Sequence, residues 1–181
     1  LPQDAVLVTA PGLATASKRL DVALRSLARL ADHRPALRFV VAGAVDPHLP
    51  LADWTRAHRL ESRVRVTGRL DLSDFVRHLV ASDIVLSLRF PTHGEISGAL
   101  IRAMGVGRPA LVTAGSPSAD EFPEGLIVPV DPGAVEVDEL TAFLGALIKD
   151  APLREAIGRL AGLYARWPSI RLSCRSACRS G

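Results

Sequence analysis

Short apolar runs alternate along this chain with longer segments in which apolar residues recur every three or four positions. The short runs predict buried strands, and the longer segments predict helices with one apolar face. Strands are expected at residues 5–9, 37–43, 64–68, 83–88, 109–113 and 126–130. Helices are expected at about 17–31, 52–58, 96–104, 137–149 and 152–164. A further helix is expected to begin after a cap at Asp71 or Ser73.

Most of the predicted strands contain continuous apolar runs and not apolar residues at every second position only, which is typical of a parallel sheet covered on both faces. The alternation of strands and helices therefore predicts an α/β fold, a Rossmann-like open parallel sheet of about six strands with helices on both faces. Such sheets bind ligands at the carboxyl ends of their strands. The candidate loops follow Thr9, Gly43, Gly68, Leu88 and Thr113.

Composition narrows the class of protein. The 181 residues are 48% hydrophobic, so a sizeable core can be buried in one domain. The formal net charge is only +3 and aromatic residues make up 4% of the chain, which disfavours nucleic-acid binding. No apolar run approaches the roughly 20 residues of a membrane span, and no signal peptide is visible, so a cytoplasmic location is expected. The absence of a first methionine suggests a piece of a longer protein.

The composition changes after Pro168, and residues 169–181 form a tail of Arg, Ser and Cys. We expect this tail to be disordered or non-native; a basic amphipathic helix is the alternative. Cys174 and Cys178 have no second pair to complete a zinc site, so no metal is expected there.

The segment 88–113 joins a strand, a glycine-bearing turn, a helix and another strand. A helix that begins at the carboxyl end of a parallel strand presents unpaired N–H groups and a partial positive charge. The residues around its start are small or apolar, namely Gly94, Ile96, Ser97 and Gly98. We therefore predict that a ligand phosphate binds at this helix start.

Two cations, Lys18 and Arg19, follow the first predicted strand and the turn at Gly12. A long cationic side chain there can reach a phosphate at the neighbouring helix start. The alternative is a pair of solvated surface charges, although cations are mildly unfavourable in the first turn of a helix.

Other polar side chains near these loops have an alternative surface role. Glu95 can accept hydrogen bonds from sugar hydroxyls, or can simply favour the helix dipole. His93 can donate to a diphosphate or sugar, or be solvated. Arg102 is expected two turns below Glu95 on one helical face and therefore toward the ligand, with a surface position as the alternative. Arg69 is expected to border a base pocket.

Three common nucleotide and hydrolase motifs are absent. The chain has no G-x-G-x-x-G after the first strand, no G-x-x-x-x-G-K-[ST] and no G-x-S-x-G. Dehydrogenase, P-loop and hydrolase functions are therefore disfavoured.

The segment resembles the E-x7-E region of group 1 retaining glycosyltransferases, which have the two-domain GT-B fold. The matching residues are Gly94-Glu95-Ile96-Ser97-Gly98, Arg102-Ala103-Met104 and Gly107-Arg108-Pro109-Ala110-Leu111. FVVAG at 39–43, VRVTG at 64–68 and ASDIVLSL at 81–88 match the family's strand and glycine markers. The resemblance covers residues 6–168 and implies that residues 1–168 form its carboxyl-terminal, nucleotide-sugar-binding domain.

The resemblance implies roles for individual residues. Lys18 takes the place of the lysine on the donor diphosphate, Glu95 that of the first glutamate near the donor sugar, and Ser97 and Gly98 those of backbone contacts. It implies a nucleoside-diphosphate sugar as the donor substrate, a hexosyl transfer with retention, and no metal or other cofactor. The acceptor site, and any contact with a membrane surface, would lie in an amino-terminal domain that this chain lacks.

The chain departs from the family pattern at two positions. Arg102 stands where the second glutamate would bind ribose, and Leu13 stands where an arginine usually follows the first-strand glycine. Arginine donates but does not accept hydrogen bonds, so ribose recognition is expected to differ. Two alternatives to a transferase half remain, a sugar-nucleotide epimerase half of the same fold and a non-catalytic nucleotide-binding or assembly domain.

Overall fold

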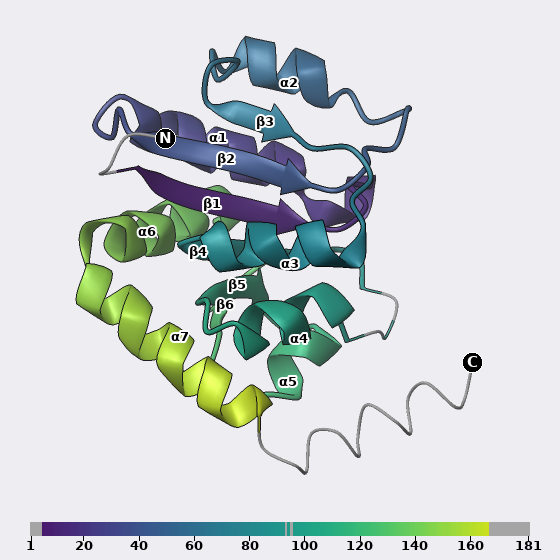
Figure 1. Ribbon diagram of the computed structural model, residues 1–181. Coiled ribbons are helices and arrows are strands. Elements are labelled where there is room, and N and C mark those ends of the chain that lie inside the picture. Colours follow the sequence, from purple (N-terminus) through teal and green to yellow (C-terminus); the bar gives the residue numbers. More distant parts are fainter. Residues whose placement is uncertain (1–4, 93, 95, 167–181) are drawn as a thin grey trace.

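The computed structural model describes residues 5–92, 94 and 96–166, and in these the expected parallel sheet is confirmed (Figure 1). All its strands are parallel, in the order β3-β2-β1-β4-β5-β6. The strands are β1 (Val6–Pro11), β2 (Leu37–Ala42), β3 (Val64–Val66), β4 (Ile84–Ser87), β5 (Ala110–Thr113) and β6 (Val128–Val130). The helices are the 3-10 helix η1 (Ala16–Lys18), then α1 (Leu20–Ala31), α2 (Leu51–Ala57), α3 (Leu72–Ala81), α4 (Gly98–Gly105), α5 (Pro117–Asp120), α6 (Glu136–Lys149) and α7 (Ala151–Ala165).

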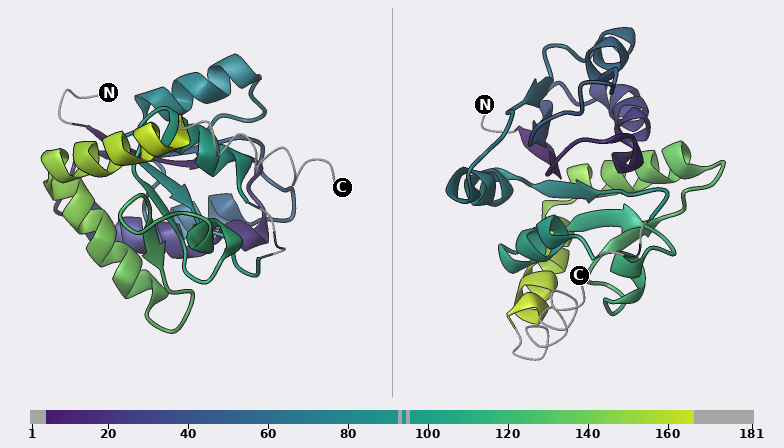
Figure 2. Two further views of the ribbon diagram at one scale, coloured as in Figure 1. Left: turned by 90° about the horizontal axis from the view of Figure 1, so that it is seen from below. Right: turned by 90° about the vertical axis from the view of Figure 1, so that its right-hand side faces the viewer.

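The helices form a layer on each face of the sheet, as Figure 2 shows from two further directions. One core lies between the sheet and α1, α2 and α6, and includes Leu24, Leu27 and Leu140. The other lies between the sheet and α3, α4, α5 and α7, and includes Leu100 and Met104. Each of these side chains is essentially removed from water, a burial worth about 1.5–3 kcal/mol per residue. Both faces are therefore covered, as the continuous apolar runs predicted.

The chain order reverses at the centre of the sheet, between β1 and β4. β1 pairs with β2 along its whole length, from Val6 opposite Leu37 to Pro11 opposite Ala42, and on its other edge pairs with β4. The connections from these two strands run to opposite sides of the sheet, which leaves a crevice at their carboxyl ends. The loops that open there begin after Pro11 and after Ser87.

Two predicted helix starts were wrong. The first helix was expected from residue 17, but α1 begins at Leu20, because Arg19 has a left-handed backbone (φ 54°) that interrupts the chain after η1. The second was expected at residue 96, but α4 begins at Gly98, with Ser97 as its cap. Glycine and left-handed positions at strand-to-helix turns shift a helix start by a residue or two without altering its apolar periodicity.

Smaller differences concern α3 and the segment before β6. Asp71, and not Ser73, caps α3, accepting a hydrogen bond from the Asp74 N–H at 2.8 Å. Val80 is 49% exposed, because it lies about 100° around the helix from the fully buried Leu79. The short helix α5 lies where only a loop was expected.

The predicted tail, residues 169–181 with Cys174 and Cys178, lies outside the described residues. In the part of the chain that is described, no helix is both long and apolar enough to cross a membrane.

Candidate functional site

Backbone hydrogen bonds tie the loops at the carboxyl edge of the sheet together. The Gly12 N–H donates to the Ala42 carbonyl at 2.9 Å, so the loop after β1 continues alongside the end of β2. The Phe90 N–H donates to the Ser17 carbonyl at 2.8 Å, which joins the loop after β4 to η1. The predicted loops after the first and fourth strands therefore meet in space, next to the crevice at β1 and β4.

Gly12 is held by close backbone packing. Its φ of +89° is in the region that favours glycine. A Cβ on the neighbouring Gly43 would lie 2.2 Å from the Gly12 carbonyl oxygen, so a side chain at 43 would push the Gly12 turn away. The turn at Gly12 thus depends on two glycines from adjacent strand ends.

Lys18 is a half-buried cation at this turn. Its Nζ donates to the Pro11 carbonyl at 3.2 Å and lies 3.9 Å from where a Cβ on Gly12 would be. Burial, and then the positive charge of Arg89, lower the pKa of Lys18 from 10.5 to about 8. None of the ion pairs in the described part of the chain involves Lys18. A half-buried ammonium with a neutral acceptor and a nearby cation is stabilised when an anion binds beside it.

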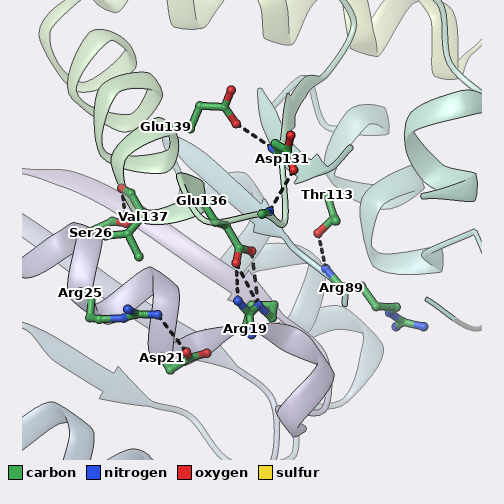
Figure 3. Close-up of polar contacts among 11 residues, drawn as sticks. Arg19, Asp21, Arg25, Ser26, Arg89, Thr113, Asp131, Glu136, Val137 and Glu139 are labelled. Carbon is green, nitrogen blue, oxygen red and sulfur yellow. Dashed lines mark hydrogen bonds and ion pairs between the residues drawn. The ribbon is translucent and has the colours of Figure 1, made fainter. Parts of the chain in front are cut away.

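Arg19 has a partner that its sequence neighbours do not suggest. Figure 3 shows its guanidinium directed at the carboxylate of Glu136, the first residue of α6. The Arg19 Nε lies 3.3 and 3.2 Å from the two carboxylate oxygens, and Nη2 also contacts Oε2. This hydrogen bond raises the pKa of Arg19. A phosphate role for Arg19 stays a prediction, and two of its nitrogens are already engaged.

The start of α4 has the expected small residues, but one of its N–H groups has a partner. The Ser97 N–H donates to Ser118 Oγ at 3.3 Å, while Ser97 Oγ accepts from the Leu100 N–H at 3.3 Å. Gly98 is exposed, and in the described part of the chain no acceptor is bound to the N–H groups of Gly98 and Ala99. These two N–H groups are the donors that a ligand anion can reach there.

Arg102 lies on the surface of α4. Its Nη1 donates to the Gly98 carbonyl at 2.9 Å, so the guanidinium folds back over the first turn of the helix. Because α4 begins at Gly98, the argument that Arg102 lies two helical turns below Glu95 does not hold. The guanidinium is nevertheless beside the turn that carries the unpaired N–H groups.

The other predicted site residues are dispersed. Gly94 is exposed with φ +83°, Ile96 is half-buried against the core of α4 and α7, and Arg69 is exposed after β3. Glu95 and His93 lie outside the described residues, so their predicted roles remain predictions.

Sequence reasoning missed Arg89, Ser118 and Glu136. The Arg89 N–H donates to Thr113 Oγ1 at 2.8 Å, which places Arg89 at the ends of β4 and β5. Figure 3 shows its guanidinium pointing away from Arg19 and Glu136. A signal for Arg89 was available, because it directly follows a buried strand in a loop already singled out. No pattern in the sequence points to Ser118 or Glu136, because each contacts a residue that is far away along the chain.

A groove of about 550 Å³ lies between α2 and β3, and is lined by Val45, Leu51, Thr55 and Val66 among others. None of the predicted site residues lines it. In the described residues no group of three or more His, Cys, Asp and Glu side chains is placed to hold a metal ion.

The family of this chain follows from its similarity to known proteins. The model of the family described as "Glycosyl transferases group 1" matches residues 4–150. The chain belongs to this family. No curated protein matches the chain.

Several solved structures share the fold at low sequence identity. HepE from Anabaena, solved with UDP and glucose, has a TM-score of 0.81 at 17% identity over 96% of this chain. The carboxyl-terminal domain of LpcC from Francisella tularensis has a TM-score of 0.73 at 19% identity, with 87% of this chain covered and 82% of that domain. WaaG, a glycosyltransferase involved in lipopolysaccharide biosynthesis, has a TM-score of 0.77 at 21% identity over 90% of this chain.

This chain spans 47% of the length of HepE and 43% of that of WaaG. The fold described here therefore corresponds to about half of each of those chains.

Proposed function

We propose that this chain is the nucleotide-sugar donor-binding half of a retaining glycosyltransferase that transfers a hexosyl group to an acceptor held by another domain. The observation that carries the proposal is Lys18, a half-buried ammonium without an ion-pair partner in the described residues, next to Gly12 at the centre of the carboxyl edge. The UDP in the HepE structures supports a nucleoside diphosphate as the anion.

The proposed reaction depends on the positively charged and N–H groups at the carboxyl edge of the sheet. When the bond between the anomeric carbon and the diphosphate breaks, negative charge develops on the leaving oxygen. Lys18 would neutralise part of that charge, and the Gly98 and Ala99 N–H groups would donate hydrogen bonds to phosphate oxygens. Arg89 adds a further positive charge beside Lys18. These groups can stabilise the departing diphosphate without a divalent metal.

The acceptor and the other catalytic groups would come from a second domain, so donor binding is the activity to test first. Calorimetry of the full chain with UDP, GDP and ADP, with and without a chelator, is the decisive experiment. We expect one of the three to bind with an affinity that the chelator does not change. Binding that requires magnesium would overturn the metal-free mechanism.

Lys18→Ala is the matching variant. A hydrogen bond to a charged partner contributes about 1.5–3 kcal/mol, so the affinity for the preferred nucleotide is expected to fall by roughly that free energy. An unchanged affinity would exclude Lys18 from the site and remove the main support for the proposal. Retention, the identity of the sugar and a cytoplasmic location stay predictions, and no observation favours the epimerase or the assembly domain.

A further inference from the structure

The turn that carries Lys18 has an unusual backbone. Arg19 joins η1 to α1 with φ 54° and ψ 36°, a left-handed conformation that is disfavoured for a residue with a side chain. Because Lys18 directly precedes it, the conformation of Arg19 sets the direction in which the chain leaves Lys18. Something must hold this turn against its intrinsic preference.

The Arg19 side chain provides the restraint. Two of its nitrogens contact the Glu136 carboxylate, whose side chain is 3% exposed, whereas that of Arg19 is 27% exposed. A carboxylate this buried loses much of its hydration, and a two-point contact with a guanidinium compensates for that loss only in a narrow geometry. The pair is therefore directional and not a loose surface contact.

A second contact fixes the position of α6 relative to α1. Ser26, fully buried on α1, donates from Oγ to the Val137 carbonyl at 3.2 Å, in the first turn of α6. The start of α6 is thereby fixed against α1, and Glu136 is presented at the turn that precedes α1. Figure 3 shows Ser26, Val137, Glu136 and Arg19 along this one contact between the helices.

We propose that the Arg19–Glu136 ion pair is a positioning device that holds the left-handed turn between η1 and α1, and so keeps the Lys18 ammonium directed at Pro11 and Gly12 for anion binding. This inference rests on the proposed function of Lys18. It assigns Arg19 an indirect role, in place of direct contact with phosphate. The two roles of Arg19 predict opposite effects when Glu136 loses its charge.

The test is the affinity of the full chain for UDP, measured by calorimetry between pH 6.5 and 9.5 for wild type and Glu136→Gln. If the pair positions Lys18, Glu136→Gln weakens binding about threefold to tenfold, less than Lys18→Ala. The midpoint of the pH dependence also moves upward from about 8, because a displaced Lys18 is better hydrated and leaves Arg89. If Arg19 instead binds phosphate directly, Glu136→Gln releases its guanidinium and strengthens binding.

Asp138→Asn is the matched control. Asp138 is also in the first turn of α6 and pairs with Arg29 of α1, but both side chains are more than half exposed. Asp138→Asn is expected to keep wild-type affinity and pH midpoint. Arg19→Gly is the second variant, because glycine adopts a positive φ without strain and keeps the fold accessible. It removes the ion pair but leaves the left-handed turn unstrained, so it should weaken UDP binding no more than Glu136→Gln does.

The outcomes separate the two proposals. If Lys18→Ala binds UDP as wild type does, the proposed function fails. If Lys18→Ala loses affinity while Glu136→Gln and Arg19→Gly match Asp138→Asn in both affinity and pH midpoint, only the positioning role is overturned.

Discussion

The positive charge of Lys18 is unfavourable for the stability of the fold, whereas the proposed binding of a diphosphate requires that charge. Its protonated form is disfavoured by burial and by Arg89, and its pKa is lowered to about 8. A bound diphosphate would supply the missing negative charge and raise that pKa again. Binding should therefore be coupled to proton uptake when the pH is at or above 8.

The first prediction is that affinity for UDP decreases as the pH rises through 8. The free protein then loses the Lys18 proton that the complex needs, and the dissociation constant rises by at most about tenfold per pH unit. The second ionisation of a terminal phosphate, near pH 6, is complete in this range and does not mask the effect. Calorimetry from pH 7 to 10 measures it, and a flat profile in wild type would contradict it.

The second prediction is that Lys18→Met stabilises the fold while it weakens binding. In the folded state the pKa is about 8 and in the unfolded state 10.5, so between these values the unfolded chain binds more protons. Wild-type stability therefore rises with pH across that window, and the unfavourable charge is fully present below pH 8. The variant should be about 1–3 kcal/mol more stable at pH 7, with the gain shrinking toward pH 10.5. Urea unfolding at pH 7 and 10 tests this; an equal or lower stability at pH 7 would count against an unfavourable charge on Lys18.

At the scale of elements, the start of α4 combines a cap and N–H groups with the guanidinium of Arg102, which comes from the last turn of the helix. Ser97 caps the helix through Leu100, and Arg102 folds back to the Gly98 carbonyl. The helix dipole and the guanidinium both favour an anion beside Gly98. Because arginine does not accept hydrogen bonds, position 102 offers no acceptor for the hydroxyl groups of a ribose.

The third prediction is that Arg102→Glu weakens UDP binding about threefold to tenfold, because it places a negative charge beside the phosphate position. It should also increase the preference for UDP over 2′-deoxy-UDP, because a carboxylate accepts hydrogen bonds from ribose hydroxyls. The control is Arg77→Glu, which changes the same charge on the exposed surface of α3. Identical effects of the two variants would place Arg102 outside the site.

The fourth prediction concerns the packing of α7. A Cβ on Gly158 would lie 2.1 Å from the carbonyl oxygen of Gly107, in the turn between α4 and β5, so Gly158→Ala must separate these backbones. The expected cost is about 1–3 kcal/mol. Gly145→Ala is the control, because its Cβ would make an ordinary 3.5 Å contact with Leu30 and alanine favours a helix. Thermal unfolding should show a lower midpoint for Gly158→Ala and an unchanged or higher one for Gly145→Ala; the reverse order would show that α7 can move away freely.

At the scale of the whole molecule, the chain corresponds to about half of the HepE and WaaG chains that share its fold. The carboxyl edge of the sheet carries Gly12, Lys18 and the start of α4, and is the face on which a donor would lie. A glycosyl transfer also needs an acceptor site, which the family resemblance assigns to the other domain.

The fifth prediction is that the isolated chain binds a nucleoside diphosphate without catalysing transfer. With UDP-glucose as the probe, release of UDP should stay at the level of the Lys18→Ala variant, because no acceptor is positioned. A coupled assay for UDP measures this. Turnover above that of Lys18→Ala would show that the residues of this half complete an active site without the second domain.

Much of the fold was predictable because it depends on local patterns. Continuous apolar runs, helical periodicity and glycine turns predicted the parallel sheet and its two covered faces. The position of Lys18 near Gly12 follows from the first strand-to-helix connection, so it could also be predicted. The starts of α1 and α4 were misplaced, because apolar periodicity does not reveal the backbone conformation of Arg19 or the cap at Ser97.

The sequence alone therefore determined the order and kind of most elements, the glycine turns and the loops that gather at the carboxyl edge. The tertiary structure decided which groups at that edge are already engaged. Glu136 is 117 positions from Arg19, and Ser118 is 21 positions from Ser97, so their contacts depend on how helices pack across the sheet. It also decided that Lys18 is half-buried near Arg89, because burial is a property of all the elements around a side chain and not of its neighbours in the sequence.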